Sequence, residues 1–437
     1  MEIENYLAKN LINKFNKKEA TIGVIGLGYV GLPLAVEKAK AGFNVIGFDI
    51  TKDRVDKVNQ GINYIGDVVQ EDLESLVSNG NLRATDDYKF IQSVDAIAIC
   101  VPTPLDIYKQ PNMEYIKSSI ESISKNIEKG TLVVLESTTY PGTTEELVKP
   151  IIEEHGFVVG ENIFLAYSPE RVDPGNKHYN TKNTPKVVGG VNEISTKVAA
   201  ALYRAVLESD VHEVSSPAVA EMEKILENTY RNINIALANE MAILCNKMGI
   251  DVWEVIDAAS TKPYGFMPFY PGPGVGGHCI PIDPWYLTWK AREYNYHTKL
   301  IEAAGEINDS MADYVVQRII EILNTQNKAL NGSKLLILGI AYKKDIDDYR
   351  SSPVLDILKK LNIFGADWIV SDPYVNEFEM NGQTFTTMNL SEELISNCDL
   401  VLITTDHSTF DYSLLNNKDK LILDTKNVKK INNCFKL

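Results

Sequence analysis

Cys279 lies in the segment whose composition is least compatible with regular secondary structure. The run PGPGVGGHCIPIDP places four glycines within six positions just before this cysteine. Glycine costs backbone entropy, so such a run suits a backbone that wraps closely around a ligand while presenting a side chain. We interpret Cys279 as a nucleophile, with Asp283 close enough to share its pocket and His278 in a minor or structural role. Cys100 and Cys245 are interpreted as buried small hydrophobic residues.

The spacing of glycines and an acid near the N-terminus predicts a dinucleotide site. An apolar strand is predicted over residues 21–25, and the motif GLGYVG follows it. Gly26 permits a tight turn, Gly28 lets the backbone approach a pyrophosphate, and Gly31 allows a helix to pack closely on the strand. The next strand ends on Asp49, whose carboxylate can accept hydrogen bonds from a ribose and would repel a 2′-phosphate. The pattern predicts NAD, rather than NADP, as the cofactor.

These residues must be positioned by a chain of 437 residues, long enough for two or three globular domains. The net charge of −16 should repel nucleic acid, so the phosphates of a ligand need local cations or backbone N–H groups. No apolar run is long enough to span a membrane, and the polar N-terminus predicts a short helix rather than a secretory signal. Five scattered cysteines fit a reducing, cytoplasmic setting and do not predict a metal site.

Apolar runs alternate with helical stretches through most of the chain, which predicts crossover units and mostly parallel sheets. These runs are TIGVIG, NVIGFD, DAIAICVP, TLVVLEST, NIFLAYSPE and KVVGG, and later KLLILGIAYK, DWIVSDPY, DLVLITT and KLILDTK. Between the two sets, residues 215–249 are apolar at three- and four-residue steps and predict one long helix. We therefore expect an α/β protein with two doubly wound parallel sheets joined by a long central helix.

A series of motifs resembles the UDP-glucose/GDP-mannose dehydrogenase family and extends from about Thr21 to Asn427. The motifs are GLGYVGLPLA, VPTP, EST, SPER, AEMEKILENTYRNINIALANE, PGPGVGGHCIPIDP and GIAYKKDIDDYRSSP. The resemblance implies an NAD-binding Rossmann domain (1–210), a central helical dimerisation region with the cysteine loop (211–325), and a Rossmann-like domain that binds a UDP-sugar (326–437). It also implies an oxidoreductase that oxidises carbon 6 of the sugar twice, to a uronic acid, using two NAD.

The catalytic residues of the family can be carried onto this chain by motif. Cys279 matches the nucleophile that traps the aldehyde as a thiohemiacetal and then forms a thioester. Lys224 and Asn228 are four residues apart, which places them on one face of a helix. By the resemblance, Lys224 would stabilise a developing alkoxide or help to move a proton, and Asn228 would donate to the oxyanion.

Further positions match residues that move protons or contact the ligands. Glu170 matches the carboxylate used in thioester hydrolysis, and Asp283 and Thr138 match residues that hold a water. The roles of Glu170, Lys224 and Asp283 are easily exchanged. The implied cofactor contacts are Gly26, Gly28, Tyr29, Val30, Gly31, Asp49, Arg54, Pro102, Thr103 and Thr138. The implied substrate contacts are Glu170, Arg171, Val172, Lys224, Asn228, Lys262, Tyr270, Gly276, Lys343 and Arg350.

The sequence around the cysteine narrows the expected substrate. UDP-glucose dehydrogenases commonly carry GFGGSCFxKD, whereas this chain has GVGGHCIPIDP, a form typical of relatives acting on N-acetylated sugars. We expect UDP-N-acetylglucosamine, with UDP-N-acetylmannosamine as the nearest alternative and UDP-glucose third. A non-catalytic protein that binds NAD or a nucleotide sugar is the alternative from another class. We also expect a homodimer or higher homo-oligomer, in which Lys262 reaches the neighbour's substrate, and a product used for capsule or other surface polysaccharide.

Overall fold

A computed structural model describes residues 5–172, 176, 178–416 and 420–437. Within these ranges the chain forms two compact units. The first contains the chain up to Glu227 together with Trp289–Asn295, and the second contains Asn228–Thr288 and Tyr296–Leu437. The boundary falls inside the long helix, so contacts divide the chain differently from the three expected domains, and the division into three remains a prediction.

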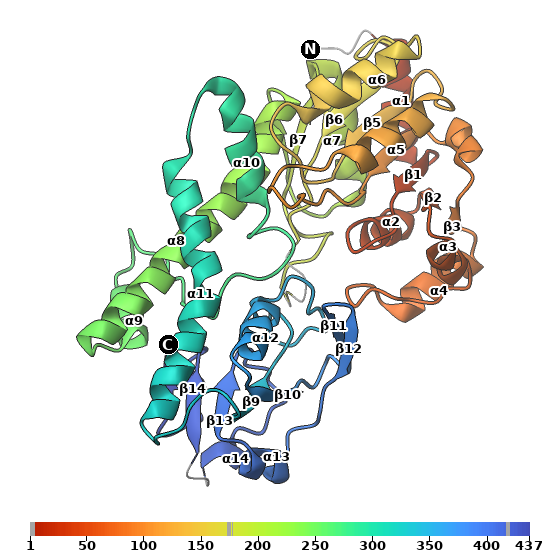
Figure 1. Ribbon diagram of the computed structural model, residues 1–437. Helices are drawn as coiled ribbons and strands as arrows, with labels where there is room; N and C mark the ends of the chain where they lie inside the picture. Colours follow the sequence, from red (N-terminus) through yellow and green to blue (C-terminus); the bar gives the residue numbers. More distant parts are fainter. Residues whose placement is uncertain (1–4, 173–175, 177, 417–419) are drawn as a thin grey trace. The chain divides into compact units, whose positions relative to one another are not determined.

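An eight-stranded sheet forms the centre of the first unit (Figure 1). Its strands are β1 (Thr21–Ile25), β2 (Asn44–Phe48), β3 (Leu82–Thr85), β4 (Ala96–Ile99), β5 (Leu132–Leu135), β6 (Phe164–Tyr167), β7 (Lys186–Gly190) and β8 (Val211–Val214). The spatial order is β3-β2-β1-β4-β5-β6-β7-β8, and neighbours are parallel except β6 and β7. The order reverses between β1 and β4, which is where such sheets bind ligands. The predicted, mostly parallel sheet is confirmed.

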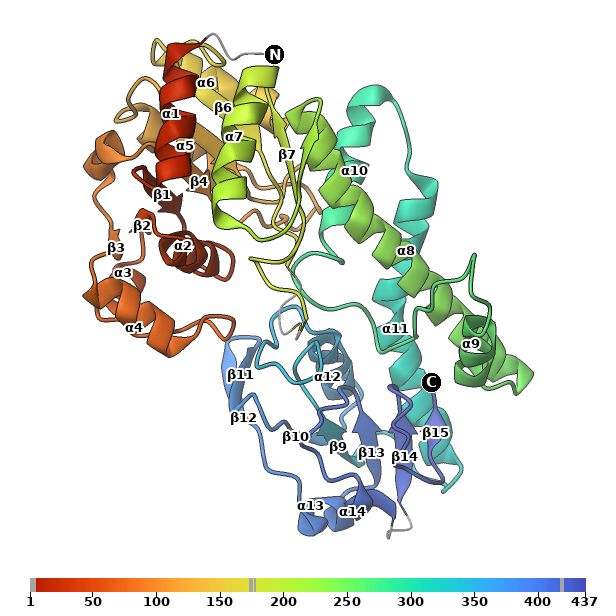
Figure 2. The same cartoon turned by 180° about the vertical axis from the view of Figure 1, so that it is seen from behind.

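Helices cover both faces of this sheet because its strands are apolar on both sides. They are α1 (Tyr6–Lys17), α2 (Gly31–Lys40), α3 (Lys52–Asn59), α4 (Gln70–Ser78), α5 (Glu114–Ser124), α6 (Lys149–Glu154) and α7 (Glu193–Val206), with a 3-10 helix η1 (Tyr88–Ser93) and a π-helical turn η2 (Thr144–Val148). Along β5, Leu132 and Val134 pack with α1, α2 and α7, whereas Val133 and Leu135 pack with α5 and α6. Figure 1 shows α5 and α6 over the sheet, and Figure 2, seen from behind, shows α1, α2 and α7.

Helix α8 (Pro217–Met248) is the long helix predicted over residues 215–249. It starts with proline, whose missing N–H is tolerated in the first turn. It ends before Gly249, which has a φ of +72°, and there the N–H of Ile250 donates to the carbonyl of Cys245. Glycine adopts this left-handed ending without strain. The helix begins in the first unit and ends in the second.

A five-stranded, wholly parallel sheet forms the centre of the second unit. Its strands are β9 (Lys334–Leu338), β10 (Asp367–Ser371), β13 (Leu400–Ile403), β14 (Leu421–Asp424) and β15 (Phe435–Lys436), in the order β10-β9-β13-β14-β15, and β11 (Glu377–Met380) and β12 (Gln383–Thr386) form a separate antiparallel hairpin. The helices are α9 (Val252–Ser260), α11 (Lys299–Asn324), α12 (Pro353–Ile363), α13 (Glu392–Asn397) and α14 (Ser413–Asn416). Helix α10 (Asp283–Ala291) follows the cysteine loop; it begins in the second unit, and its last residues and η3 (Arg292–Tyr294) belong to the first. Core residues of α11 and α12 cover one face of the sheet, and those of α13 and α14 the other.

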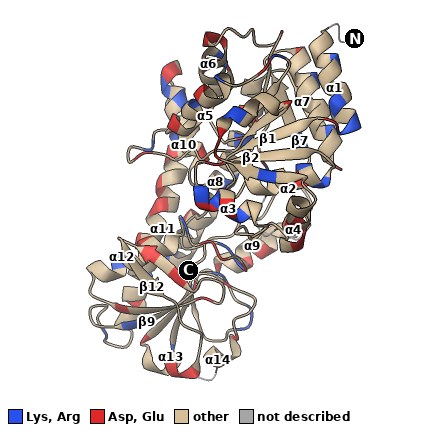
Figure 3. Cartoon of the chain, turned by 90° about the vertical axis from the view of Figure 1, so that its right-hand side faces the viewer, with Lys and Arg blue, Asp and Glu red and all other residues tan. Residues whose placement is uncertain are grey.

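Charged residues are unevenly spread over the helices. Figure 3 shows Asp and Glu on helices of both units, α6 and α13 among them, as the net charge of −16 implies. Lys and Arg are drawn on α3, which supplies Lys52, Arg54 and Lys57 directly after Asp49. Among the described residues, no helix is both long and apolar enough to cross a membrane.

Candidate active site

The turn between β1 and α2 has the backbone shape that the glycine motif predicts. Gly26 has a φ of +88°, and a Cβ there would lie 2.8 Å from the carbonyl oxygen of Cys100. A Cβ on Gly31 would lie 1.7 Å from the carbonyl oxygen of Gly26. A Cβ on Gly28, in contrast, would have no atom within 4 Å. Gly26 and Gly31 are therefore required by the fold of the turn, whereas Gly28 leaves bare backbone facing open space.

Asp49, at the carboxyl end of β2, is tied to this turn. Its buried carboxylate accepts the backbone N–H groups of Leu27 at 2.9 Å and of Thr51 at 2.8 Å. Nη1 of Arg54 lies 3.3 Å from the same carboxylate. Asp49, predicted to bind a ribose, therefore also links the glycine turn to β2 through a hydrogen bond with Leu27. This structural role was not predicted.

The other predicted cofactor residues lie at the ends of neighbouring elements. The side chains of Tyr29 and Val30 are exposed at the start of α2, and Pro102 is exposed in the loop after β4. Oγ1 of Thr103 donates to the carbonyl of Thr138 at 2.8 Å, which joins the loop after β4 to the loop after β5. The structure therefore brings Thr103 and Thr138 together at the carboxyl edge of the sheet.

Glu170 follows β6, and both oxygens of its carboxylate are held. Oε1 accepts the backbone N–H groups of Arg171 and Val172 at 2.8 and 3.0 Å. Oε2 accepts a hydrogen bond from Nζ of Lys186 at 3.2 Å. Lys224, buried on α8, donates through Nζ to the backbone carbonyl of Glu170 at 2.6 Å. The first unit therefore joins two predicted catalytic residues, Glu170 and Lys224, whereas the contact with Lys186 was not predicted.

Arg171 was predicted to contact the substrate, and in the structure its guanidinium is paired within the protein. It forms ion pairs with Glu227 and, at 3.3 Å, with Glu223, both on α8. Nη1 also donates to the carbonyl of Pro185 at 3.0 Å. Burial and the charge of Glu227 raise the pKa of Glu223, although Arg171 opposes them. Arg171 therefore fastens the loop after β6 to α8, and its contact with the substrate remains a prediction.

The glycines before Cys279 are needed because the loop packs closely on the protein itself. Gly274 has a φ of +135°, and a Cβ there would lie 2.8 Å from Cβ of Pro353. A Cβ on Gly276 would lie 2.5 Å from Cβ of Tyr342. The structure therefore shows these glycines packing against Pro353 and Tyr342, and their predicted wrapping of a ligand stays a prediction. Gly276 is a close-packing position, and its predicted contact with the substrate remains untested.

Cys279 and Asp283 are positioned by the start of α10. Cys279 is partly exposed, and its carbonyl accepts the backbone N–H of Asp283 at 2.8 Å. Nδ2 of Asn228 donates to Oδ2 of Asp283 at 2.6 Å, and both of these residues are buried. The second unit therefore brings Asn228, Cys279 and Asp283 together. Cys100 and Cys245 are buried, as predicted.

Three asparagines that the sequence analysis did not single out anchor the cysteine loop. Oδ1 of Asn239 accepts the N–H of Gly272 at 2.9 Å, and Nδ2 of Asn232 donates to the carbonyl of Ile280 at 3.1 Å. Asn308, on α11, joins the two by donating to the carbonyl of Asn232 and accepting from Nδ2 of Asn239. The available signal was the seven-residue spacing of Asn232 and Asn239, which places both on one face of α8.

Two predicted substrate residues have partners near α9. The hydroxyl of Tyr270 donates to Asp257 at 3.2 Å, and its ring stacks on Trp253 with centroids 5.6 Å apart. Nζ of Lys262 lies 4.9 Å from the ring centre of Tyr264. These contacts hold the segment between α9 and the cysteine loop, and the predicted contacts of Tyr270 and Lys262 with a substrate remain predictions.

Lys343 and Arg350 lie in the segment between β9 and α12. The guanidinium of Arg350 makes two hydrogen bonds with the carboxylate of Asp348, at 2.9 and 2.8 Å. Nε2 of His278 lies 3.2 Å from the same carboxylate, which links the cysteine loop to this segment. Burial would raise the pKa of Asp348, but Arg350 and His278 outweigh it and hold the pKa well below its usual range. Lys343 is partly buried, and the predicted contacts of Lys343 and Arg350 with a substrate stay predictions.

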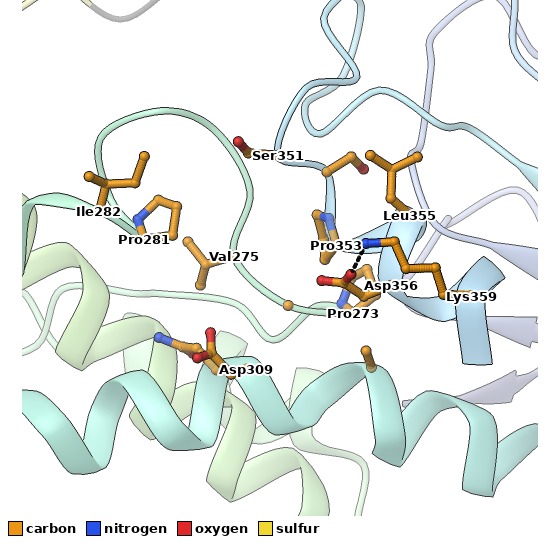
Figure 4. Close-up of a pocket in the computed structure, with 14 residues that line it drawn as sticks. Pro273, Val275, Pro281, Ile282, Asp309, Ser351, Pro353, Leu355, Asp356 and Lys359 are labelled. Atoms are coloured by element: carbon orange, nitrogen blue, oxygen red, sulfur yellow. Dashed lines mark hydrogen bonds and ion pairs between the residues drawn. The ribbon is translucent and has the colours of Figure 1, made fainter. Parts of the chain in front are cut away.

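A cavity of about 300 Å³ lies in the second unit beside the cysteine loop (Figure 4). Pro273 and Val275 of the loop line one side, Asp309 of α11 lines another, and Lys359 of α12 lies at the rim with its ion pair to Asp356. None of the predicted catalytic or substrate residues lines this cavity. We therefore do not assign the substrate to it.

Comparisons with known proteins agree on the family of this chain and name different sugars among its relatives. Models of the UDP-glucose/GDP-mannose dehydrogenase family match in order, with the NAD binding domain at residues 20–207, the central domain at 218–310 and the UDP binding domain at 336–431. The chain is 40% identical over 360 residues to the UDP-N-acetyl-D-glucosamine 6-dehydrogenase of Pseudomonas aeruginosa, covering 82% of this chain and 84% of that one. It is 36% identical over 422 residues to the UDP-N-acetyl-D-mannosamine dehydrogenase of Methanocaldococcus jannaschii, covering 93% and 92%. The solved structure of a UDP-D-ManNAc dehydrogenase from Pyrococcus horikoshii matches with a TM-score of 0.87 at 32% identity, covering 95% of this chain and 98% of that one.

Proposed function

Since this chain belongs to the UDP-glucose/GDP-mannose dehydrogenase family, we propose that it oxidises carbon 6 of UDP-N-acetylglucosamine twice, to the uronic acid. The observation that carries the choice of sugar is the 40% identity to a UDP-N-acetyl-D-glucosamine 6-dehydrogenase. The motif GVGGHCIPIDP around Cys279 supports an N-acetylated sugar. A uronic acid product of this kind would supply a surface polysaccharide.

The residues of the first unit fit NAD, the cofactor of the family. Gly28 presents backbone without a side chain and with open space beyond it, as close approach of a pyrophosphate requires. Helix α2 begins at Gly31, and the positive end of its dipole favours phosphate. Asp49 is suited to ribose hydroxyls and disfavours a 2′-phosphate. When bound, NAD accepts the hydride in both oxidations.

Cys279 is the proposed nucleophile. Its thiolate adds to the carbonyl carbon of the aldehyde and forms a thiohemiacetal, which is oxidised to a thioester. Water then adds to the thioester carbonyl, the bond between carbon and sulfur breaks, and Cys279 leaves as a thiolate. Because the aldehyde stays bonded to sulfur, both oxidations are completed without its release.

The neighbouring groups have proposed roles that follow from their chemistry. One N–H of the Asn228 amide is used by Asp283, and the second is proposed to donate to the oxyanion. Asp283 and Thr138 are proposed to hold a water for proton transfer. Lys224 is proposed to stabilise the developing alkoxide. Glu170 is proposed to take the proton of the water that hydrolyses the thioester.

A second candidate substrate is UDP-N-acetylmannosamine, the epimer at carbon 2 of the sugar. It is supported by the 36% identity to a UDP-N-acetyl-D-mannosamine dehydrogenase and by the likeness to the solved UDP-D-ManNAc dehydrogenase. UDP-glucose is the third candidate. A non-catalytic binding protein is the alternative from another class, and it does not account for the chemically matched set of Thr138, Glu170, Lys224, Asn228, Cys279 and Asp283.

An assay of the purified protein with NAD and each of the three UDP-sugars tests the proposal. We expect UDP-N-acetylglucosamine to give the highest kcat/KM, with two reduced cofactors formed for each uronic acid. NADP should support a rate lower by about tenfold or more, which corresponds to about 1.4 kcal/mol. A higher kcat/KM with the mannosamine epimer would transfer the proposal to that substrate. Binding of UDP-sugar and NAD without turnover would leave the non-catalytic alternative.

A further inference from the structure

Lys38, Glu136 and Lys186 form a cluster of buried charges that contacts Glu170 through Lys186. The inference drawn from this cluster rests on the role proposed above for Glu170 in hydrolysis of the thioester. We propose that Lys186 is a positioning residue for thioester hydrolysis: its ammonium holds the carboxylate of Glu170, and Glu136 in turn holds Lys186. All members of the cluster belong to the first unit.

Lys186 lies on β7, and its Nζ contacts two carboxylates. It lies 2.7 Å from Oε2 of Glu136 and 3.2 Å from Oε2 of Glu170. Glu136, at the end of β5, is itself fixed because the hydroxyl of Tyr203 donates to its Oε1 at 2.7 Å. Glu136, Lys186 and Tyr203 are all buried. Glu170, which lies in a loop, is therefore held by a side chain from a strand whose own position is set by buried partners.

A second lysine, Lys38, also pairs with Glu136, so Glu136 does not neutralise the charge of Lys186 by itself. Nζ of Lys38, on α2, lies 3.6 Å from Oε1 of Glu136 and has no hydrogen-bond partner among the described residues. Burial lowers the pKa of Lys38, with Glu136 acting against it. Burial also acts to lower the pKa of Lys186, but Glu136 and Glu170 outweigh it and raise that pKa. Lys186 therefore stays protonated, and Glu136 is shared between two lysines rather than neutralising Lys186 alone.

The hydrogen bonds of Glu170 leave room for one water. Each carboxylate oxygen can accept about two hydrogen bonds. Oε1 already accepts two, from the N–H groups of Arg171 and Val172. Oε2 accepts one, from Lys186, within the part of the chain that the structure describes. The remaining acceptor position on Oε2 is the one from which Glu170 would take a proton from water.

Stability alone does not account for these charges. A buried ion pair contributes little beyond a well-packed apolar pair, because the loss of hydration offsets the attraction. The side chain of Glu170 is 16% exposed, whereas those of Lys38 and Glu136 are fully buried and that of Lys186 is 6% exposed. Of the two carboxylates in this cluster, that of Glu170 is the one exposed to solvent, and the charges that hold it are buried.

The test compares the first turnover with the steady state, since Lys186 is expected to act only after the thioester has formed. The double variant Lys186→Met/Glu136→Gln removes the charges of both residues, so Glu136 is not left as an unpaired carboxylate. Lys38 loses its ion-pair partner in this variant, and burial, which lowers its pKa, favours its neutral form. We expect the first turnover, seen as a burst of reduced cofactor, to proceed at close to the wild-type rate. The steady-state rate that follows should be lowered about tenfold or more. The KM for NAD and for the UDP-sugar should change less than about twofold, and mass spectrometry should show a sugar thioester on Cys279.

Two single variants are the controls for charge. Lys186→Arg keeps the positive charge and should retain a steady-state rate within about threefold of the wild type. Lys197→Met breaks the exposed ion pair with Glu193 on α7 and should behave as the wild type. If the double variant does not fold, the single variant Lys186→Met carries the same expectation, because Lys38 remains as an ion-pair partner of Glu136. Equal losses of the burst and of the steady-state rate would point to a structural role and overturn the inference.

A cycle with Glu170→Gln separates this inference from the proposed function. If Lys186 acts through Glu170, adding Glu170→Gln to the double variant lowers the steady-state rate no further than Glu170→Gln alone. Additive losses, or a wild-type steady-state rate in the double variant, overturn the inference and leave the role of Glu170 intact. Wild-type turnover by Glu170→Gln would instead overturn the role proposed for Glu170 itself.

Discussion

The environments of the cysteines differ in ways that matter for their chemistry. Burial and the nearby charge of Glu136 raise the pKa of Cys100 well above its usual value, and burial also raises the pKa of Cys398. A thiol that is held protonated is a poor nucleophile. Cys279 is partly exposed and begins the turn into α10. Cys434 is also partly exposed, but burial raises the pKa of its thiol. Cys279 is therefore the better candidate for a nucleophile, and Cys434 offers a matched control.

Replacing Cys279 tests covalent catalysis. Cys279→Ser should form a small burst of reduced cofactor near the enzyme concentration and then stall, because an ester hydrolyses far more slowly than a thioester. Cys279→Ala should lose acid formation by roughly a hundredfold or more while it still binds NAD and the UDP-sugar. Intact-mass measurement of the serine variant reports the adduct. Cys434→Ser should turn over normally, and sustained wild-type turnover by both Cys279 variants would leave that residue with a packing role.

The glycines of the first turn separate cofactor binding from folding. Gly28→Ala adds a methyl group where no atom lies within 4 Å, so the protein should fold with an unchanged melting temperature. The same methyl group would stand where the pyrophosphate must approach, and the Kd for NAD should rise by about tenfold or more. Gly31→Ala places Cβ 1.7 Å from a carbonyl oxygen and should fail to fold stably. Calorimetric NAD titration and thermal unfolding check both outcomes, and unchanged NAD binding by Gly28→Ala would contradict the proposed site.

At the scale of elements, both sheets use the same arrangement at the end of their first strand. Gly339 follows β9 with a φ of +95°, as Gly26 follows β1. Asp372, after β10, accepts the N–H of Ile340 at 2.7 Å, much as Asp49 accepts that of Leu27. The carboxylate of Asp372 also lies 3.1 Å from Nε2 of the buried His407. The carboxylate of Asp372 therefore already has an imidazole partner, and we infer that it serves to hold the turn after β9.

The contact of α8 with the start of η2 depends on a buried carboxylate. Glu221 accepts the N–H of Gly142 at 2.6 Å and the N–H and hydroxyl of Thr144 at 2.9 and 2.7 Å. Burial raises the pKa of Glu221 to about 7, although these donors oppose it. The folded state then binds more protons than the unfolded state between about pH 4.5 and 7, so this group's contribution to stability falls as the pH rises through that range.

Glu221→Gln should remove this pH dependence. As the pH rises from about 5 to about 8, the wild type should lose up to about 3 kcal/mol of stability relative to the variant, because only the wild type must ionise a buried group. Thermal unfolding of both proteins across that range measures the difference. A constant difference, or a wild type that gains stability relative to the variant, would contradict the raised pKa.

At the scale of the whole molecule, one face of α8 is apolar and exposed in the single chain. Tyr230, Leu237 and Leu244 recur every seven residues and are 46%, 56% and 46% exposed. A repeating apolar stripe of this kind is expected to be covered by another surface. The family resemblance implies a dimer, and we propose that this stripe lies in its interface.

Leu237→Glu should therefore weaken self-association, because a buried charge without a partner destabilises an interface. We expect light scattering to report a dimer for the wild type and a substantial fraction of monomer for the variant at the same concentration. Leu300→Glu replaces a leucine that is 66% exposed on α11 and should leave the dimer unchanged. A wild type that is monomeric at all concentrations would contradict the proposed assembly.

The sequence by itself determined the order and type of most elements. The buried strands of both sheets and the long helix α8 were predicted because apolar runs and helical periodicity are local patterns. Strands β3, β8, β11, β12 and β15 were not predicted. Their burial patterns include exposed positions, as in LRAT and EFEM, so they lack the continuous apolar run on which the prediction depended. The cofactor turn was also predictable, since Gly26, Gly31 and Asp49 act within one short stretch of chain.

Only the tertiary structure decided which side chains support the site. Lys186 and Glu136 are fifty residues apart in the chain, and Asn239 and Asn308 are sixty-nine apart, yet each pair is joined by a hydrogen bond. Nothing in the local sequence marks such partners, because their contact depends on how strands and helices pack. The same reason explains why the close packing of the glycines near Cys279 against Pro353 and Tyr342 was not predicted. Their neighbours lie far along the chain, and packing alone brings them within contact distance.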